Sequence, residues 1–284
     1  MSAPQAEKRD GSESGWATTR LRRFSLAVTF FTALRLPIPG RATDADLWGS
    51  TAWYAPIGCA LGALAWGIYA GGLELTGSPL LAAVIVVLAL ELFTRALHLD
   101  GLMDTCDGFF SGASRERALE IMKDSRVGAM GAFAAIGVIL LKVTALATLS
   151  RHDAALPLIA GWAAARGLAV FDLRCFAYAR AEGTGAAFAR GGKGVDYARS
   201  GSIFPLVVAL IVSAGAAGAI GAAAEPGLSG TLTGLAVIGG AVAVTLLAQV
   251  AVARRLGGLT GDVYGMGIEL VEALALVAGC IAVR

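Results

Sequence analysis

The chain alternates long apolar segments with short polar ones, and this alternation predicts its fold. A helix needs roughly 20 apolar residues to cross about 30 Å of hydrocarbon, so each run of that length is a candidate membrane span. We expect an all-α fold, a polytopic membrane helix bundle with about seven transmembrane helices. The candidate spans cover residues 52–72, 80–99, 128–149, 154–176, 203–223, 231–252 and 264–283.

Lys and Arg are concentrated in alternate connections between these spans. The N-terminal segment and the second, fourth and sixth loops are rich in them, whereas the loops around Glu74, Arg151 and Glu225 hold one basic residue between them. Because cytoplasmic loops are enriched in Lys and Arg, we expect a cytoplasmic N-terminus and a C-terminus on the other side. The predicted location is a bacterial inner membrane, with membrane lipid around the spans.

The N-terminal part of the chain divides into two segments. Residues 1–19 are polar, which predicts a disordered tail, and we expect residues 20–284 to form a single integral-membrane catalytic domain. The apolar stretch 24–34 resembles a signal peptide, but Arg35 interrupts it and no small-residue cleavage site follows. We therefore interpret this stretch as a helix in the membrane interface.

Composition supports the membrane assignment and narrows the function. Hydrophobic residues make up 56% of the chain and charged residues only 15%, which excludes an ordinary cytosolic globule. The 38 glycines fit close helix packing in lipid. The net charge of +2 reflects membrane topology, so we expect no nucleic-acid partner. The four cysteines lack CxxC spacing, which argues against a zinc site and a disulfide framework.

An aspartate-rich segment follows the second candidate span. Asp100, Asp104 and Asp107 are four and three residues apart, so a continuous helix places their carboxylates on one face. Three like charges repel one another there unless a hard cation neutralises them, and Mg²⁺ with oxygen ligands is the natural candidate. The alternative is a solvated helix end that binds no ligand.

Charged residues flank this segment on both sides. Glu91, Arg95 and His98 precede it on roughly the same helical face, where Glu91 and Arg95 could equally form a structural ion pair. Lys123 and Arg126 follow it and could reach a bound diphosphate, or belong to an ordinary surface helix. The predicted Mg²⁺ site therefore has candidate substrate-binding cations on either side.

A second acidic segment opens the last candidate span. Five glycines between Arg255 and Glu269 predict a tight or broken helix entry, with backbone N–H groups available to an anion. Asp262, Glu269 and Glu272 can share one helical face, and burying the two glutamates without partners is costly. We interpret these acids as a second set of metal ligands opposing the first, because paired metals clamp both reacting oxygens.

The two acidic segments resemble those of the cobalamin synthase family, the adenosylcobinamide-GDP ribazoletransferases. The resemblance rests on residues 98–108, 115–128 and 256–265 together with Glu269, and it extends from about Phe30 to the C-terminus. Met103 departs from the family pattern, in which a small residue is common at this position. The N-terminal polar tail lies outside the resemblance.

This resemblance implies a late step of cobalamin (vitamin B12) biosynthesis. In that step a hydroxyl of α-ribazole, or of its 5′-phosphate, attacks the phosphorus attached to adenosylcobinamide, and GMP leaves. The resemblance implies Mg²⁺ as the cofactor, and a corrinoid nucleotide and α-ribazole as small-molecule substrates. It is compatible with contacts to other cobalamin-assembly enzymes and with a homo-oligomer.

The predicted site residues fall into three groups. The glycine-rich loop around Arg180 and Lys193 offers cations for nucleotide phosphates, although such loops are commonly linkers. The catalytic candidates are Asp104, Asp107 and His98; the substrate-binding candidates are Arg95, Lys123, Arg126, Arg180, Lys193 and Arg255; the metal candidates are Asp100, Asp104, Asp107, Asp262 and Glu269.

Three other classes share some of these features. A CDP-alcohol phosphotransferase also uses aspartates on membrane helices, but the Ala-Arg pair expected after Gly108 is absent. A UbiA-type prenyltransferase also has two aspartate-rich motifs. A cation-coupled transporter needs carboxylates near the membrane midplane and two related halves, whereas the acidic cluster lies at the end of a span.

Overall fold

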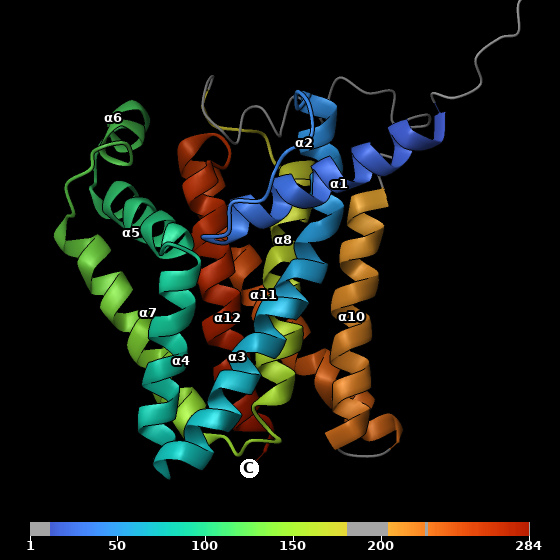
Figure 1. Ribbon diagram of the computed structural model, residues 1–284. Coiled ribbons are helices and arrows are strands. Elements are labelled where there is room, and N and C mark those ends of the chain that lie inside the picture. Colours follow the sequence, from blue (N-terminus) through green and yellow to red (C-terminus); the bar gives the residue numbers. More distant parts are fainter. Residues whose placement is uncertain (1–11, 181–203, 225–226, 284) are drawn as a thin grey trace, which may run out of the picture.

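The computed structural model describes residues 12–180, 204–224 and 227–283, which fold as a bundle of helices (Figure 1). No β-strand occurs among these residues, and one isolated parallel bridge joins Tyr178 and Leu259. The predicted all-α fold is therefore confirmed. The elements are α1 (Ser12–Phe31), α2 (Asp44–Ser50), the 3-10 turn η1 (Thr51–Trp53), α3 (Tyr54–Thr76), α4 (Pro79–Phe93), α5 (Leu97–Phe110), α6 (Arg115–Ile121), α7 (Ala129–Thr148), the π-helical turn η2 (Leu156–Ala160), α8 (Gly161–Cys175), α10 (Phe204–Ala224), α11 (Leu228–Leu256) and α12 (Gly261–Ala282).

The multi-pass architecture is visible in the length and apolar character of the helices. In the described part of the chain, five segments are long and apolar enough to cross a membrane, and the count rises to six if α4 and α5 make one bent span. We expected about seven. The predicted span that is missing from these six is 203–223, which corresponds to the apolar helix α10. The five are Asp44–Thr76, Ala129–Thr148, Leu156–Cys175, Leu228–Leu256 and Gly261–Ala282.

The second candidate span does not continue as one helix through the aspartates. α4 begins at Pro79, after the capping residue Ser78, and ends at Phe93. Arg95 and Ala96 then adopt positive φ angles of 60° and 49°, and the chain turns by 87° into α5. The span predicted at 80–99 is therefore interrupted, whereas the three aspartates do share one continuous helix, α5. The aspartates consequently lie on a separate short helix near one end of the bundle (Figure 1).

Glycines bring particular helices into backbone contact. Gly58 and Gly62 of α3 pack directly on the backbone of η2 and α8, and a Cβ atom at either position would find no room. Gly101 of α5 packs in the same way on the backbone of Asp262 in α12. Small residues permit this close approach inside a membrane, as expected from the glycine content. The contact between α5 and α12 joins the two acidic segments.

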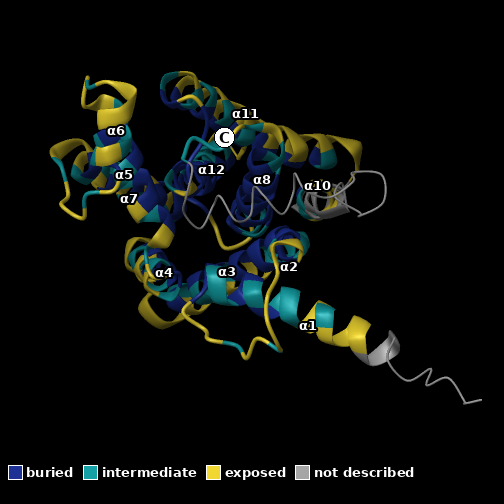
Figure 2. Cartoon of the chain, turned by 90° about the horizontal axis from the view of Figure 1, so that it is seen from above, coloured by how far each residue is buried: buried dark blue, intermediate teal, exposed yellow. Residues whose placement is uncertain are grey.

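The buried centre of the bundle is formed by α8 and α12. Seen from above in Figure 2, both helices are largely dark blue, and the exposed residues gather on the outer helices. In the apolar window of Leu156–Cys175, 83% of the residues are buried, against 33% in α11. Charged side chains on such a buried helix need partners inside the protein.

α1 begins earlier than expected. Residues 12–19, which we placed in a disordered tail, form its first turns, and residues 1–11 lie outside the described part of the chain. The guanidinium carbon of Arg20 lies 3.9 Å from the ring centroid of Trp16, one turn earlier, and this contact favours the helix. Figure 1 shows α1 lying across the upper end of the bundle and the C-terminus at the lower end.

Candidate active site

Two helices bring acidic side chains from distant parts of the sequence to one place. Asp100 and Asp104 lie one turn apart on α5, the first exposed and the second half-buried. Asp262 lies in the first turn of α12, against Gly101 of α5. Asp104 is within electrostatic range of both Asp100 and Asp262. We call these three residues the acidic site.

A glycine-rich turn sets the start of α12. Gly257 ends α11 with a φ of 74°, and Gly258 follows with a φ of 149°, close against the carbonyl of Ala177. The N–H of Gly258 donates to Ala253, and the N–H of Leu259 donates to Ala177. The N–H groups of Gly258 and Leu259 are therefore not available to an anion. Their hydrogen bonds instead fasten the segment after α8 beside α12.

The segment after α8 places one cation, Arg180, beside the acidic site. An Nη of Arg180 lies 2.9 Å from Oδ2 of Asp262, and Arg180 is also within electrostatic range of Asp104. The Oγ1 of Thr260 lies 3.2 Å from the same Asp262 oxygen, while Thr260 caps α12 by accepting from the N–H of Val263. The predicted substrate-binding residue Arg180 thus lies beside two of the predicted metal ligands.

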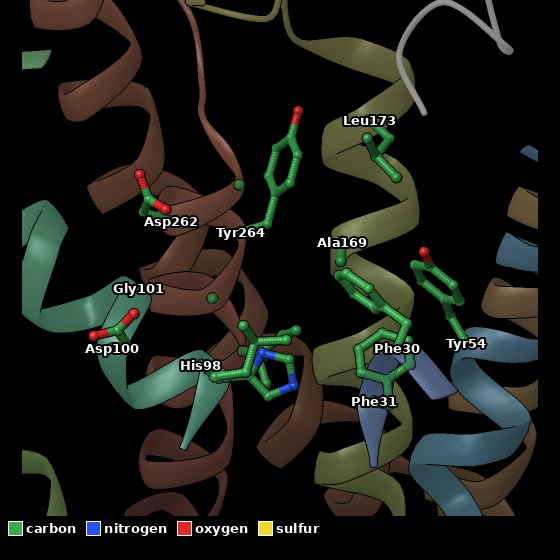
Figure 3. A pocket seen from close by; sticks show the side chains of 14 residues that line it. Phe30, Phe31, Tyr54, His98, Asp100, Gly101, Ala169, Leu173, Asp262 and Tyr264 are labelled. Carbon is green, nitrogen blue, oxygen red and sulfur yellow. The ribbon is translucent and has the colours of Figure 1, made fainter. Parts of the chain in front are cut away.

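A cavity of about 200 Å³ opens beside the acidic site, between α1, α3, α5, α8 and α12. Figure 3 shows Asp100 and Asp262 on one side of this cavity, with the ring of Tyr264 next to Asp262. Other aromatic rings lie on the opposite side, and an imidazole lies between the two sides. The residues that define these sides are Asp100 and Asp262, then Phe30, Phe31 and Tyr54, and finally His98. We call this space the aromatic cavity.

The third aspartate of α5 has a different role from the other two. The Oδ2 of Asp107 accepts the N–H of Gly128 at 2.7 Å, and its Oδ1 accepts the N–H of Gly131 at 2.8 Å. Both donors belong to the beginning of α7, where a negative charge is favourable. Both carboxylate oxygens of Asp107 therefore hold α7 to α5. Asp107 also lies within electrostatic range of Asp104, and its metal role stays a prediction.

Glu269 lies in a cluster of charges inside the bundle and not in the acidic site. Its Oε2 is 2.7 Å from Nζ of Lys142, which is also 2.7 Å from Glu272 and 3.2 Å from Glu91. Arg166 forms a further ion pair with Glu272. We call these five residues the buried charge cluster. Lys142 compensates the charge of Glu269 at this buried position, and the metal role of Glu269 stays a prediction.

Arg95 does not pair with Glu91, contrary to one of the two interpretations of the sequence. An Nη of Arg95 donates to the carbonyls of Thr29 and Phe30 at 3.2 and 3.4 Å, which are orphan acceptors at the end of α1. Arg95 therefore fastens the end of α1 to the turn between α4 and α5, beside the aromatic cavity.

Other predicted cations are spread over the surface near α6. Arg126 donates to both carboxylate oxygens of Asp124, and these hydrogen bonds lower the pKa of Asp124 to about 2. The pair lines an open groove together with Asp107. Lys123 is exposed. Arg126 therefore already has a protein counterion at neutral pH.

Arg255 lies at the junction of α11 and α6, away from the acidic site. The guanidinium of Arg255 donates to the carbonyl of Ala113 and lies over the ring of Phe109, at 5.3 Å from its centroid. It therefore connects α11 to the turn before α6. Lys193 lies outside the described residues.

The donor set at the acidic site is compatible with Mg²⁺. Within the described residues, no group of three or more His, Cys, Asp or Glu side chains forms a ready metal cage. Mg²⁺ seldom uses such a cage, because it keeps several waters and binds one or two carboxylates together with substrate phosphates. Asp100, Asp104 and Asp262 offer accessible carboxylates of this kind.

Sequence reasoning missed the aromatic wall, and it noticed Lys142 and Arg166 inside candidate spans without pairing them with the glutamates. Phe30, Phe31 and Tyr54 come from helices whose apolar pattern carries no sign of a cavity. Lys142 and Arg166 are a detectable signal, because each lies inside a candidate span where a lone charge is expensive. Glu91, Glu269 and Glu272 also lie in candidate spans, and these glutamates are the natural partners of the two cations.

The fold and the site define a multi-pass, all-α membrane protein with an acidic site beside a cavity. The sequence matches the profile of the family described as Cobalamin-5-phosphate synthase over residues 23–280. The chain belongs to this family, and it is an enzyme, a transferase of cobalamin biosynthesis. The match favours our first interpretation over the phosphotransferase, prenyltransferase and transporter alternatives.

Curated relatives agree with this assignment. A protein of Brevibacillus brevis named adenosylcobinamide-GDP ribazoletransferase is 36% identical over 263 residues, covering 90% of this chain and 96% of the relative. Proteins with the same name from Escherichia coli and Desulfitobacterium hafniense are 38% and 35% identical, covering 90% of this chain and 98% and 95% of the relatives. No solved structure matches the chain.

Proposed function

We propose that this protein transfers the phosphoadenosylcobinamide group from adenosylcobinamide-GDP to α-ribazole, or to α-ribazole 5′-phosphate, and releases GMP. The names of the family and of the curated relatives support this reaction. The structural observation that carries it is the convergence of Asp100, Asp104 and Asp262 from two helices, with Arg180 beside them, at the edge of a cavity.

The reaction requires little covalent participation from the protein. A ribazole hydroxyl forms a new bond to the phosphorus attached to adenosylcobinamide, the bridging P–O bond breaks, and GMP departs with those electrons. Phosphoryl transfer of this kind depends on positioning and charge neutralisation. Arg180 supplies positive charge near the diphosphate, and a carboxylate of the acidic site receives the hydroxyl proton.

We propose Mg²⁺ as the cofactor, held by carboxylates among Asp100, Asp104 and Asp262. When bound together with a diphosphate, Mg²⁺ offsets the repulsion among these acids and between the acids and the phosphates. Arg180 alone does not balance three carboxylates, which is why the acidic site favours a further cation.

We propose further that the acidic site faces the cytoplasm of a bacterial inner membrane. The basic residues of α6 and of the end of α11 lie on the same side of the bundle as α5, since Arg115 bonds to the carbonyl of Leu256. Alkaline phosphatase fused after Glu74 should be active in a bacterial host, and the same fusion after Arg117 inactive. The opposite pattern would place the site on the other face.

A direct assay tests the reaction. Purified protein in detergent should release GMP from adenosylcobinamide-GDP only when α-ribazole or its 5′-phosphate and Mg²⁺ are present, and EDTA should stop the release. GMP release no greater than that of an Asp262→Asn variant rejects the proposal. A CDP-alcohol offered in place of the corrinoid nucleotide should give no CMP.

A further inference from the structure

We propose that the aromatic cavity binds the base of the ribazole substrate, with the base against the rings of α1 and α3 and its ribose directed toward the acidic site. The chemical class is a planar, bicyclic aromatic heterocycle that carries a ring nitrogen acceptor and no ring N–H donor. This inference rests on the proposed function and names the substrate that occupies one specific cavity.

The size of the cavity decides which part of the substrates it can hold. Its volume of about 200 Å³ is below the roughly 300–1,000 Å³ of sites for drug-sized ligands. A corrinoid macrocycle with its side chains is far too large for this space. One bicyclic ring system fits, so the candidates are the benzimidazole of ribazole and the guanine of the nucleotide.

The walls favour an apolar aromatic ring. The rings of Phe31 and Tyr54 meet edge to face at 4.5 Å, and those of Phe30 and Tyr54 lie almost parallel at 6.1 Å. Aromatic rings in these arrangements present both faces and edges to a further ring. Ala169 and Leu173 of α8 complete this apolar side. Methyl groups on a benzimidazole would be buried here.

His98 supplies the polar recognition that the cavity requires. It is only 4% exposed, it lines the cavity, and its Nε2 has no hydrogen-bond partner in the described structure. Leaving such a buried polar atom unsatisfied is costly, so a ligand that completes its hydrogen bonding binds more tightly. An imidazole Nε2–H can donate to the free ring nitrogen of a benzimidazole.

The position of the acids orients the ligand. Asp100 and Asp262 lie on the side of the cavity opposite the phenylalanines (Figure 3). A base held at the rings therefore directs its ribose hydroxyls toward the acids, where the corrinoid phosphorus is attacked. Guanine fits this side less well, because its N–H donors would lie against Phe30, Phe31 and Leu173, whose side chains carry no acceptor.

Two matched variants of α8 test the assignment. Ala169 lines the aromatic cavity and is 5% exposed, and Ala164 is 4% exposed but lines a separate apolar cavity against α10 and α11. Ala169→Leu should raise KM for α-ribazole at least about tenfold and leave KM for adenosylcobinamide-GDP unchanged. Ala164→Leu should change neither. A rise confined to adenosylcobinamide-GDP, or no rise in Ala169→Leu, overturns the proposal.

A binding measurement keeps the test independent of turnover. Saturation-transfer NMR with α-ribazole should show contact of its base with the wild-type protein and with Ala164→Leu, and lose it in Ala169→Leu. Guanosine should not compete for this signal. Equal signals in all three proteins, or competition by guanosine, overturn the assignment. Absence of GMP release by a protein that still binds the base would reject the proposed reaction alone.

A conservative series at His98 covers the case in which Ala169→Leu does not fold. His98→Gln keeps an N–H donor near the position of Nε2, and His98→Leu removes it. The α-ribazole signal should survive in His98→Gln and weaken at least about tenfold in His98→Leu. Equal binding by both variants contradicts the role given to His98.

Discussion

The acidic site and the buried charge cluster both contain carboxylates, but these carboxylates differ in solvent exposure and in the number of cations that contact them. Each has three carboxylates contributed by two helices. In the buried charge cluster, Lys142 and Arg166 contact the acids, and the side chains of Lys142 and Glu269 are each 2% exposed. In the acidic site, Arg180 pairs with Asp262, and Asp100 is exposed.

The difference shows that compensation and access separate a structural acid from a ligand-binding one. An ion pair buried inside a protein has already lost its water, and removing one partner leaves an uncompensated charge. A carboxylate that is accessible and whose charge is not balanced by protein cations can instead bind a metal ion, including one that is also bound to a substrate phosphate. The two regions should therefore respond to mutation in different ways.

The largest effect is expected from Lys142→Met, which leaves three carboxylates inside the bundle without their central cation. Breaking a buried ion pair typically costs about 3–5 kcal/mol, so the variant should unfold at a much lower temperature or fail to accumulate. Thermal unfolding in detergent measures this. Lys123→Met, which changes an exposed lysine, should unfold like the wild type. A stable but inactive Lys142→Met protein would give the cluster a catalytic role.

Asp262→Asn should abolish most of the activity and leave the unfolding temperature unchanged, which is the opposite of the result expected for Lys142→Met. We expect GMP release to fall by at least about 100-fold, because a group that neutralises charge at the reacting centre is lost. Asp153→Asn, in the loop before η2, is the control and should retain its rate. An unfolding temperature that falls along with the activity would remove the distinction between the two regions.

A pair of substitutions compares the metal dependence of the two regions directly. Asp104→Asn should raise the Mg²⁺ concentration for half-maximal activity by about tenfold, since losing a residue that supports a metal typically costs 10–100-fold in affinity. Glu269→Gln should lower the unfolding temperature and leave that Mg²⁺ concentration unchanged. A shift in Mg²⁺ dependence for Glu269→Gln would restore its predicted role as a ligand.

Asp107→Asn should have the smallest effect, because this residue holds the beginning of α7. Loss of a negative charge at a helix N-terminus costs about 1 kcal/mol, and GMP release should remain within about threefold of the wild type. Asp124→Asn, at an exposed ion pair, serves as the control for stability. A loss of activity as large as that of Asp262→Asn would return Asp107 to the acidic site.

Several features of the site follow from local sequence because they depend on short-range rules. The lengths of the apolar runs predict membrane helices, and the aspartates at positions 100 and 104 share a face because both lie on one helix. The glycines predict close approach, which Gly101 provides between α5 and α12. These rules need only the spacing of residues along the chain.

The sequence did not predict the bend between α4 and α5. Arg95 and Ala96 adopt a left-handed conformation that such residues rarely take, and local propensity gives no sign of it. Tertiary contacts fix the turn, including the hydrogen bonds from Arg95 to the end of α1. The bend separates Glu91 from the aspartates and leaves it beside Lys142.

The sequence by itself determined the class of fold, the two acidic segments and the family. Only the tertiary structure decided that Glu269 pairs with Lys142, that Asp107 holds α7, and that rings from α1 and α3 face the acidic site across a cavity. The physical reason is the range of the interactions. Hydrophobic periodicity acts between neighbours in the chain, whereas the partner of a buried charge and the walls of a cavity come from helices far apart in sequence.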